Sequence, residues 1–405
     1  MRKILVGPVL ALLASCLSLP AVAFAAPAGP VKISFWHYLP TRAAYDALDA
    51  FATEYNRSQT KYVVSAVGQG DPKTEAVKIV AALRGNNVPT MALVDNAFFN
   101  RLAVGDQALA LDKLTATLPA AVVQDYYPAV WQYGEVNGHR YGLPWAASAL
   151  LLYYNVDALK SRGLSAPKTW DELAKIAKLI SSRASKGLIW ILDMWPFATL
   201  VEGRGGHLFK NGQPNFNGPD ALDGLKYLAD LNKANALLPR SYNELSLAGI
   251  DFLRTRGQMV VGTTSVFPAA KEYSYAIKIG AVALPGKGVS GEGQIVILDK
   301  TDPEAQKGAW EFWQFLNRPE NLARWVKASF YLPTRRSVTT ALGDFVTNNV
   351  VLSQGLIALE RSEGYPHAAE LNEWELTLNT ALERVLKGND DPVKVMEDAQ
   401  RAIRP

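Results

Sequence analysis

Residues 142–155 read GLPWAASALLLYYN, and this stretch decides how the rest of the chain is interpreted. A Gly-Leu-Pro turn leads into ALLLYY, a run that is apolar on both faces and meets its first charge at Asp157. A short apolar run bounded by turn residues is typical of a strand buried on both sides, but a segment of buried helix has the same pattern. The stretch therefore predicts an interior strand, with Trp145 and Ser148 at its entrance.

The segments on either side of this run alternate between strand-like and helix-like patterns. VKISFW at 31–36 and PTMALVD at 89–95 read as strands, whereas residues 41–56 repeat apolar side chains at the spacing of a helix face. Thr169 and Glu172 form a capping box that opens a further helix. This alternation predicts an α/β fold with mostly parallel sheets. The length of 405 residues suggests two lobes, and because no linker separates them, we expect strands to cross between the lobes.

The first residues have the organisation of an export signal. A basic start, an apolar segment and a small-residue site ending at Ala25 predict a signal peptide over 1–25. An alternative is a lipobox at LASC, in which Cys16 is lipidated, but the residues after Cys16 stay apolar and favour cleavage after Ala25. Pro8 and Pro20 interrupt the apolar segment, which argues against an uncleaved membrane anchor. The sequence thus predicts an exported protein.

Composition excludes several classes of function. Without the predicted signal, the chain has 40 basic and 38 acidic residues. This near balance argues against binding to nucleic acid or to a membrane surface. Cys16 is the only cysteine, so the mature chain has no disulfide and no thiolate chemistry. The histidines lack metal-ligand spacing and no nucleotide-binding motif follows a strand, so we expect no metal and no cofactor. A glycosidase stays open, because a pair of carboxylates leaves no spacing signature; the acidic residues available to it are Asp95, Asp193, Glu202 and Glu292.

Six stretches together resemble the extracellular solute-binding proteins of ABC importers. The class with the greatest likeness binds sugars, oligosaccharides and glycerol 3-phosphate. The stretches are KISFWHYLP, GHRYGLPWAASALLLYYNVDAL, PKTWDELAKIAKLI, GQMVVGTTS, AVALPGKG and FWQFLNRPENLARWVKASFYLPTRRS. No one of them is decisive, but their order and spacing are specific to the family and extend over essentially the whole mature chain.

The resemblance implies a two-lobe α/β fold of the type II periplasmic-binding-protein kind, with three crossings between the lobes and a ligand cleft between them. The crossings fall at 142–155, 281–286 and 330–335. The implied organisation is a signal peptide at 1–25, an N-terminal lobe at 27–146 plus 283–330, and a C-terminal lobe at 147–282 plus 333–405. The implied function is capture of a carbohydrate by hinge closure and its delivery to the membrane permease of an ABC transporter. We expect a monomer that does not bind nucleic acid and is not an enzyme.

By position, the resemblance also marks candidate ligand-binding residues. Sugar rings stack their apolar faces on aromatic side chains, and their hydroxyls pair with carboxylates, amides and hydroxyls. The candidates are Tyr38, Asp95, Asn96, Trp145, Ser148, Trp195, Arg204, Thr264, Ser265, Gly291, Glu292, Tyr331 and His367. Trp145 and Ser148 are expected to look into the cleft, and Tyr331, at the third crossing, carries the most weight. Each has a structural alternative, such as a turn cap for Asp95 or core packing for Trp195.

The resemblance leaves two kinds of ligand to consider, a neutral sugar and a phosphorylated compound. A phosphate site needs arginine or lysine side chains and helix N-termini. His367 falls where glycerol-phosphate binders carry an arginine, and Glu292 places a negative charge where such an anion would lie. Arg204, Arg335 and Arg336 could compensate, although surface arginines are usually solvated. The sequence thus favours a neutral carbohydrate, with glycerol 3-phosphate or a glycerophosphodiester as the alternative.

Overall fold

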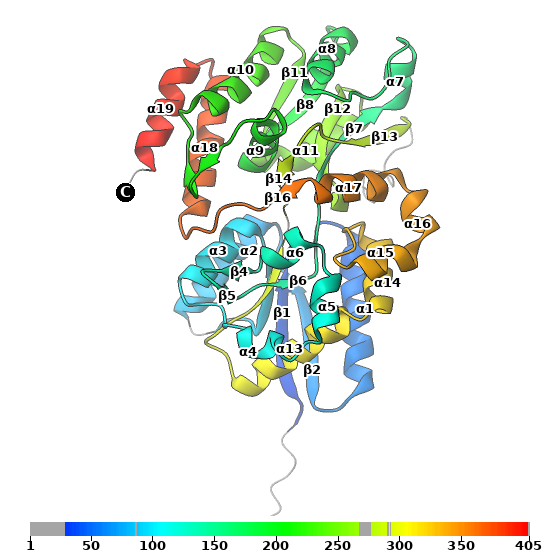
Figure 1. Ribbon diagram of the computed structural model, residues 1–405, viewed down its shortest axis with the longest axis vertical. Coiled ribbons are helices and arrows are strands. Elements are labelled where there is room, and N and C mark those ends of the chain that lie inside the picture. The colour runs from blue at the N-terminus through cyan, green and yellow to red at the C-terminus, as the bar shows by residue number, and fades with distance from the viewer. Residues whose placement is uncertain (1–28, 86, 267–276, 290, 292, 404–405) are drawn as a thin grey trace, which may run out of the picture.

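The computed structural model describes residues 29–85, 87–266, 277–289, 291 and 293–403. The predicted signal peptide, Cys16 and Glu292 lie outside the described residues. Figure 1 shows two α/β lobes stacked along the long axis of the molecule, the first holding the blue and cyan segments and the second the green and red ones. Among the described residues, no helix combines the length and apolarity needed to cross a bilayer.

The N-terminal lobe is built on a five-stranded sheet with the order β2-β1-β3-β15-β6. Its strands are β1 (Val31–His37), β2 (Tyr62–Gly68), β3 (Met91–Val94), β6 (Leu143–Pro144) and β15 (Gln294–Ile297). The larger helices of this part are α1 (Arg42–Ser58), α2 (Pro72–Arg84), α3 (Asn96–Val104), α13 (Pro303–Leu316) and α14 (Pro319–Ser329). Helix α1 confirms the predicted 41–56 helix: Thr41 caps it, and Leu48 and Phe51 lie on its buried face.

The C-terminal lobe has its own five-stranded sheet, with the order β11-β8-β12-β7-β13. Its strands are β7 (Leu150–Asn155), β8 (Lys186–Leu192), β11 (Leu237–Ser241), β12 (Gly257–Thr263) and β13 (Ile279–Ala283). Its larger helices are α8 (Trp170–Ile180), α9 (Met194–Gly203), α10 (Pro219–Lys233), α17 (Val350–Glu360), α18 (Leu371–Leu386) and α19 (Pro392–Ala402). The predicted cap of α8 is confirmed, because the Thr169 hydroxyl accepts a hydrogen bond from the Glu172 amide at 3.1 Å.

Shorter elements fill the connections. The helices are α4 (Asp112–Thr115), α5 (Ala120–Asp125), α6 (Pro128–Gln132), α7 (Val156–Lys160), η1 (Tyr242–Glu244), α11 (Leu245–Leu253), η2 (Thr264–Val266), α15 (Arg336–Leu342) and α16 (Asp344–Thr347). The strands are β4 (Glu135–Val136), β5 (His139–Arg140), β9 (Phe209–Lys210), β10 (Gln213–Pro214), β14 (Gly288–Val289) and β16 (Ser362–Glu363).

The stretch at 142–155 contributes a strand to each lobe: β6 lies in the first sheet and β7 in the second. Residues Leu150 to Tyr153 of β7 are buried, which confirms the predicted interior strand. A second crossing joins β13 to β15, and a third follows α14. The crossings pair with one another, because Ser148 bridges Gly291 and Ala147 bridges Leu332. Three adjacent backbone segments therefore connect the lobes.

The strands at the crossings depart from the predicted parallel order. Within each lobe, strands joined by βα units are parallel, as in β2-β1-β3 and β11-β8-β12. The pairs β15-β3, β15-β6, β12-β7 and β13-β7 are antiparallel. Each of these pairs includes a strand that enters from the other lobe, so its direction is not set by a helical crossover within the same sheet. The prediction of mostly parallel sheets holds only for the βα units.

An aromatic stack lies beside the crossings, inside the N-terminal lobe. The ring centroids of Trp145 and Trp325 are 4.0 Å apart at an interplanar angle of 19°. Tyr331 also stacks with Trp325, with centroids 5.5 Å apart at 11°. None of the three side chains is more than 1% exposed. This aromatic stack belongs to the hydrophobic core.

The chain after the third crossing contacts both lobes. Val338 and Leu342 pack in the same core as Ile33 and Phe35 of β1. Helix α17, further along, packs against β13 and β7 of the second sheet. The division of the chain at 330–333 stays a prediction, because this segment bridges the lobes.

Candidate functional site

Each lobe places the N-terminus of a helix at the lobe boundary. Asp95 follows β3 and caps α3, where its carboxylate accepts a hydrogen bond from the Phe98 amide at 2.8 Å. Asp193 follows β8 and caps α9, accepting hydrogen bonds from the Trp195 amide at 3.0 Å and from Asn379 Nδ2 at 2.9 Å. Burial raises the pKa of Asp95, and the charge of Asp193 raises it further. Both carboxylates follow the carboxyl end of a strand, where α/β folds place their sites.

Lys73 connects the lobes through two direct contacts. Its Nζ lies 3.3 Å from Oε1 of Glu375, which belongs to α18. The same ammonium lies 3.7 Å from the ring centroid of Tyr242 in η1. Burial raises the pKa of Glu375 well above its usual range, the charges of Asp193 and Asp95 raise it further, and Lys73 opposes the shift. Carboxylates of both lobes thus share one region with this lysine.

Glu75 adds a buried carboxyl group to the same region. The residue is 1% exposed, and neither carboxyl oxygen has a hydrogen-bond partner among the described residues. Burial, together with the nearby charge of Asp95, raises the pKa of Glu75 to about 9. Its carboxyl is therefore protonated at neutral pH. We refer to Lys73, Glu75, Asp95, Asp193 and Glu375 as the charged cluster.

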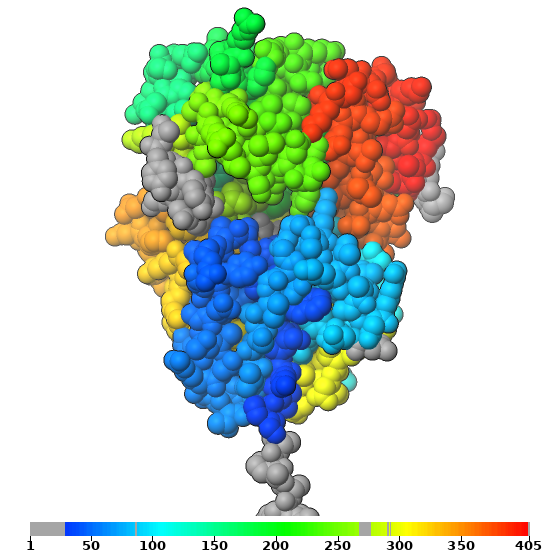
Figure 2. Space-filling model, turned by 180° about the vertical axis from the view of Figure 1, so that it is seen from behind, coloured from blue at the N-terminus to red at the C-terminus, as the bar shows by residue number. Residues whose placement is uncertain are grey.

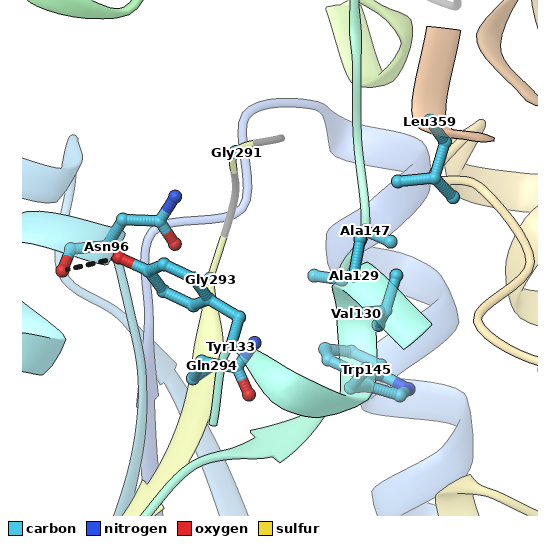
Figure 3. Close-up of a pocket in the computed structure, with 11 residues that line it drawn as sticks. Asn96, Ala129, Val130, Tyr133, Trp145, Ala147, Gly291, Gly293, Gln294 and Leu359 are labelled. Atoms are coloured by element: carbon cyan, nitrogen blue, oxygen red, sulfur yellow. Dashed lines mark hydrogen bonds between the residues drawn. The ribbon is translucent and has the colours of Figure 1, made fainter. Parts of the chain in front are cut away.

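A second polar group surrounds His367. Asn100 Nδ2 donates to the Tyr133 hydroxyl at 3.0 Å, and that hydroxyl donates to the Asn96 carbonyl at 3.3 Å, the contact dashed in Figure 3. His367 Nδ1 lies 2.9 Å from Asn100 Oδ1, and its ring centroid lies 5.2 Å from that of Tyr133. His367 precedes α18 in the chain but contacts α3 of the N-terminal lobe. It therefore lies at the lobe boundary.

Trp195 lies at the start of α9 against the second crossing. Its indole Nε1 donates to the Val289 carbonyl at 2.7 Å. A Cβ atom on Gly291 would come within 2.2 Å of the indole ring, so a side chain at that position would displace the ring. Trp195 is only partly buried. This combination of a fixed orientation and remaining exposure suits an aromatic plate for a ligand.

The predicted hydroxyl groups are buried and bonded to one another. Ser148 Oγ lies 3.1 Å from Thr264 Oγ1, and Thr263 Oγ1 lies 2.8 Å from Ser265 Oγ. Ser148, Thr264 and Ser265 are each at most 2% exposed. In this conformation they fasten the first crossing to the end of β12 and do not open to a cleft, contrary to our expectation for Ser148.

A cavity of about 20 Å³ lies at the boundary (Figure 3). Its lining includes Asn96, Tyr133, Trp145, Gly291 and Gln294. This volume holds roughly one water molecule, far less than a sugar ring. Figure 2 shows the outer surface hollowed along the boundary between the two lobes. A sugar therefore enters this cavity only if the lobes separate or its lining side chains shift.

The structure brings some predicted residues to the boundary and places others elsewhere. Asp95, Asn96, Trp195, Gly291 and His367 come together there. Tyr38, 6% exposed, lies beside the second crossing, because a Cβ on Gly293 would meet its hydroxyl at 2.4 Å.

Three predicted residues are engaged elsewhere. Arg204 lies at the far end of α9 from Asp193, paired with Asp223 at 2.8 Å, and its guanidinium covers the ring of Tyr227. Trp145 borders the small cavity but packs in the aromatic stack, so it is not an open plate as expected, and Tyr331 packs in the same stack.

Sequence reasoning missed Lys73, Glu75, Tyr242 and Glu375. Glu75 carried a usable signal, because it lies four residues before Ile79 on the buried face of α2, where a carboxylate is out of place. Lys73 and Glu375 are distant in the chain and carried none. Among the residues that the structure describes, no group of histidine, cysteine and acidic side chains could hold a metal ion.

Comparison with known proteins identifies a family and several relatives. Residues 48–352 match the family described as bacterial extracellular solute-binding protein. The sn-glycerol-3-phosphate-binding periplasmic protein UgpB of Yersinia enterocolitica is 27% identical over 362 residues, covering 80% of this chain and 78% of the relative. UgpB of Rhizobium meliloti is 26% identical over 411 residues, covering 91% and 92%.

Solved structures share the fold at lower sequence identity. The GacH receptor of Streptomyces glaucescens, studied with and without acarbose, has a TM-score of 0.82 at 20% identity, covering 93% of this chain and 98% of the receptor. UgpB of Mycobacterium tuberculosis, in complex with glycerophosphocholine, has a TM-score of 0.81 at 21% identity, covering 93% and 97%. These likenesses show the two-lobe fold of solute-binding proteins.

Proposed function

Because the chain belongs to the bacterial extracellular solute-binding protein family, we propose that it captures a sugar or oligosaccharide between its lobes and delivers it to an ABC-transporter permease. The protein is exported and acts outside the cytoplasm, as its family and its periplasmic relatives do. The observation that carries the proposal is the set of three paired crossings beside polar and aromatic side chains from both lobes.

Hinge motion at the crossings gives these side chains a role. Rotation about the segments joined at Ser148–Gly291 and Ala147–Leu332 separates the lobes and opens the boundary. Trp195 then offers its ring to the apolar face of a sugar. Asp95 and Asn96 supply oxygen and nitrogen atoms for its hydroxyl groups. Closure restores the contact between Lys73 and Glu375 and encloses the solute.

The protein acts by binding and returns its ligand unchanged. Asp95 and Asp193 already cap α3 and α9, which gives both carboxylates a structural role without any reaction. Incubation with maltose-type oligosaccharides should leave them intact in chromatography. Cleavage of any of them would favour the glycosidase alternative instead.

Glycerol 3-phosphate, or a glycerophosphodiester, is the second candidate ligand. The observation that favours it is the sequence relationship to UgpB proteins, which reaches 27% identity with the Yersinia enterocolitica protein. The side chains at the boundary weigh against it, because Lys73, the basic member of the charged cluster, is already paired with Glu375.

A thermal-shift screen followed by calorimetry tests the proposal. The panel holds maltose-type oligosaccharides, monosaccharides, polyols, sn-glycerol 3-phosphate and glycerophosphocholine. A neutral carbohydrate should stabilise the protein saturably, by about 2.7 kcal/mol at a hundred-fold excess over Kd. The Trp195→Ala variant, tested in parallel at the same ligand concentration, should lose about half of this response. Stabilisation by the phosphorylated compounds alone would assign the protein to the second candidate.

A further inference from the structure

We propose that the cavity beside the crossings is the inner end of the solute site, and that Gln294 is a specificity-determining residue that binds one hydroxymethyl group of the solute there. The inference rests on the proposed function and deepens it, because it names a chemical group that the solute carries. Hexoses and glycerol compounds both carry hydroxymethyl groups, so the inference applies to either candidate ligand.

Both lobes and the crossings contribute to the wall of this cavity. Asn96 begins α3 of the N-terminal lobe, whereas Leu359 belongs to α17, which packs against the second sheet. Ala147 and Gly291 lie in the first and second crossings. Hinge motion at the crossings therefore opens the cavity to the space between the lobes.

The two sides of the cavity differ in polarity. Figure 3 shows Asn96, Tyr133 and Gln294 on one side of the gap and a group of apolar side chains on the other. The apolar group consists of Ala129, Val130, Ala147 and Leu359. A buried water molecule usually makes about three hydrogen bonds, and only one side of this cavity offers polar side chains. A hydroxymethyl group matches both sides, with its oxygen toward the polar side chains and its carbon toward the apolar ones.

Gln294 brings an unused hydrogen-bonding atom to the polar side. The residue is 4% exposed, and its Oε1 atom has no hydrogen-bond partner among the described residues. The Tyr133 hydroxyl, by contrast, already accepts from Asn100 and donates to the Asn96 carbonyl. A buried amide oxygen without its hydrogen bond is costly, and a solute hydroxyl that donates to this oxygen removes the cost.

The surroundings hold Gln294 in place. It begins β15 and lies opposite Val94 of β3 and Pro144 of β6, so it moves with the first sheet. A Cβ atom on Gly142 would come within 2.9 Å of Gln294 Oε1, and the glycine therefore leaves the space in which the carboxamide lies. Closure of the lobes brings the polar side of the cavity toward Leu359 and encloses the group between them.

The test replaces Gln294 by methionine, which has a similar length and no amide. Calorimetry measures the binding of maltose, D-glucose, 6-deoxy-D-glucose and sn-glycerol 3-phosphate to the wild type and to Gln294→Met. Each compound that carries a hydroxymethyl group and binds the wild type should bind the variant about ten-fold more weakly. 6-Deoxy-D-glucose lacks this hydroxyl, so the two proteins should bind it equally.

Urea unfolding without any solute separates this role from a structural one. Because Oε1 has no partner to lose among the described residues, Gln294→Met should be at least as stable as the wild type. The matched control is Gln306→Met on α13, which removes an amide that donates to the Leu298 and Asp299 carbonyls. This control should lose stability and bind each compound as the wild type does.

The outcomes separate this inference from the proposed function. If a sugar binds both proteins equally, or if the wild type binds 6-deoxy-D-glucose as tightly as D-glucose, the inference fails while carbohydrate binding stands. If sn-glycerol 3-phosphate alone binds, and binds Gln294→Met more weakly, hydroxymethyl recognition stands and the carbohydrate proposal fails. A variant that is less stable but binds equally would mean that the cavity holds an ordered water only, which overturns the inference. Should Gln294→Met not fold, the comparison of D-glucose with 6-deoxy-D-glucose on the wild type decides by the same criterion.

Discussion

Two groups of aromatic side chains lie close to the crossings, and they differ in what surrounds them. Trp145, Trp325 and Tyr331 form the aromatic stack, in which each ring contacts another ring and at most 1% of each side chain is exposed. Trp195 instead starts a helix at the lobe boundary, is partly exposed and is fixed by the Val289 carbonyl. The resemblance marked Trp145, Tyr331 and Trp195 alike. Position in the chain therefore does not distinguish a ring that supports the hinge from one that can meet a solute; the neighbouring groups do.

The largest effect is expected in the aromatic stack. Trp325→Ala removes the central ring, which is 0% exposed, and should lower the free energy of unfolding by about 3–5 kcal/mol. Urea unfolding followed by circular dichroism measures the loss. Trp195→Ala is the matched control and should lose far less. Equal losses in the two variants would remove the distinction between the two groups.

Burial stabilises the aromatic stack, whereas burial of the Glu75 carboxyl at the lobe boundary should lower the stability of the fold as the pH rises. Its folded-state pKa of about 9 lies above the ordinary value of 4.5, so the unfolded chain loses this proton first as the pH rises. Stability should therefore fall progressively between pH 4.5 and 9. Glu75→Gln removes this loss and should be more stable than the wild type at pH 8, by on the order of 3 kcal/mol.

At pH 4.5 the two proteins should unfold at nearly the same urea concentration, because the Glu75 carboxyl is then protonated in the folded state and half protonated in the unfolded state, which lowers stability by only about 0.4 kcal/mol. A stability difference that does not change between pH 4.5 and pH 8 would show that Glu75 is not the titrating group.

Trp195 should affect binding more than folding. Trp195→Ala loses a stacked ring and should raise the Kd for the carbohydrate about ten-fold, close to 1.4 kcal/mol. Trp195→Phe should recover part of the affinity, and Tyr331→Phe, which keeps a ring in the stack, should bind as the wild type does. Calorimetry with each variant measures these values. Weaker binding by Tyr331→Phe than by Trp195→Ala would exchange the roles of the two groups.

The smallest effect concerns the contact between lobes. Lys73→Met removes the pairing with Glu375, and because the Lys73 side chain is 41% exposed, the loss should be about 0.2–1 kcal/mol. Stopped-flow measurements should show a few-fold faster release of the solute, with less dependence on salt. Lys78→Met, on the same helix, removes a lysine that donates to the Gln69 carbonyl of its own lobe and should leave release unchanged. Identical release rates in all three proteins would exclude a role for Lys73 in closure.

The sequence predicted the architecture more completely than the site. The apolar run at 150–155 and the absence of a linker indicated a crossing strand, because a segment buried in two sheets admits no polar face. The antiparallel pairing of β7 with β13 and of β15 with β3 was missed, since strand direction at a crossing depends on the other lobe.

At the site, Asp95 was predicted because it ends a strand, and Trp195 was predicted from its position in the resemblance to the family. The contact of Lys73 with Glu375 and Tyr242 joins distant parts of the chain and leaves no local pattern. Trp145 and Tyr331 have the same chemistry as a sugar-binding plate, and only their packing reveals that they belong to the core.

Hinge closure over a solute is the central claim, and a distance across the boundary tests it most directly. Val77 of α2 and Leu376 of α18 are 69% and 62% exposed and lie on the helices that carry Lys73 and Glu375. The described residues contain no cysteine, so Val77→Cys/Leu376→Cys accepts a pair of spin labels without further changes. A saturating carbohydrate should shorten the label distance and narrow its distribution, returning to the longer distance when the sugar is removed. An unchanged distribution, with calorimetry showing the sugar bound, would contradict the account.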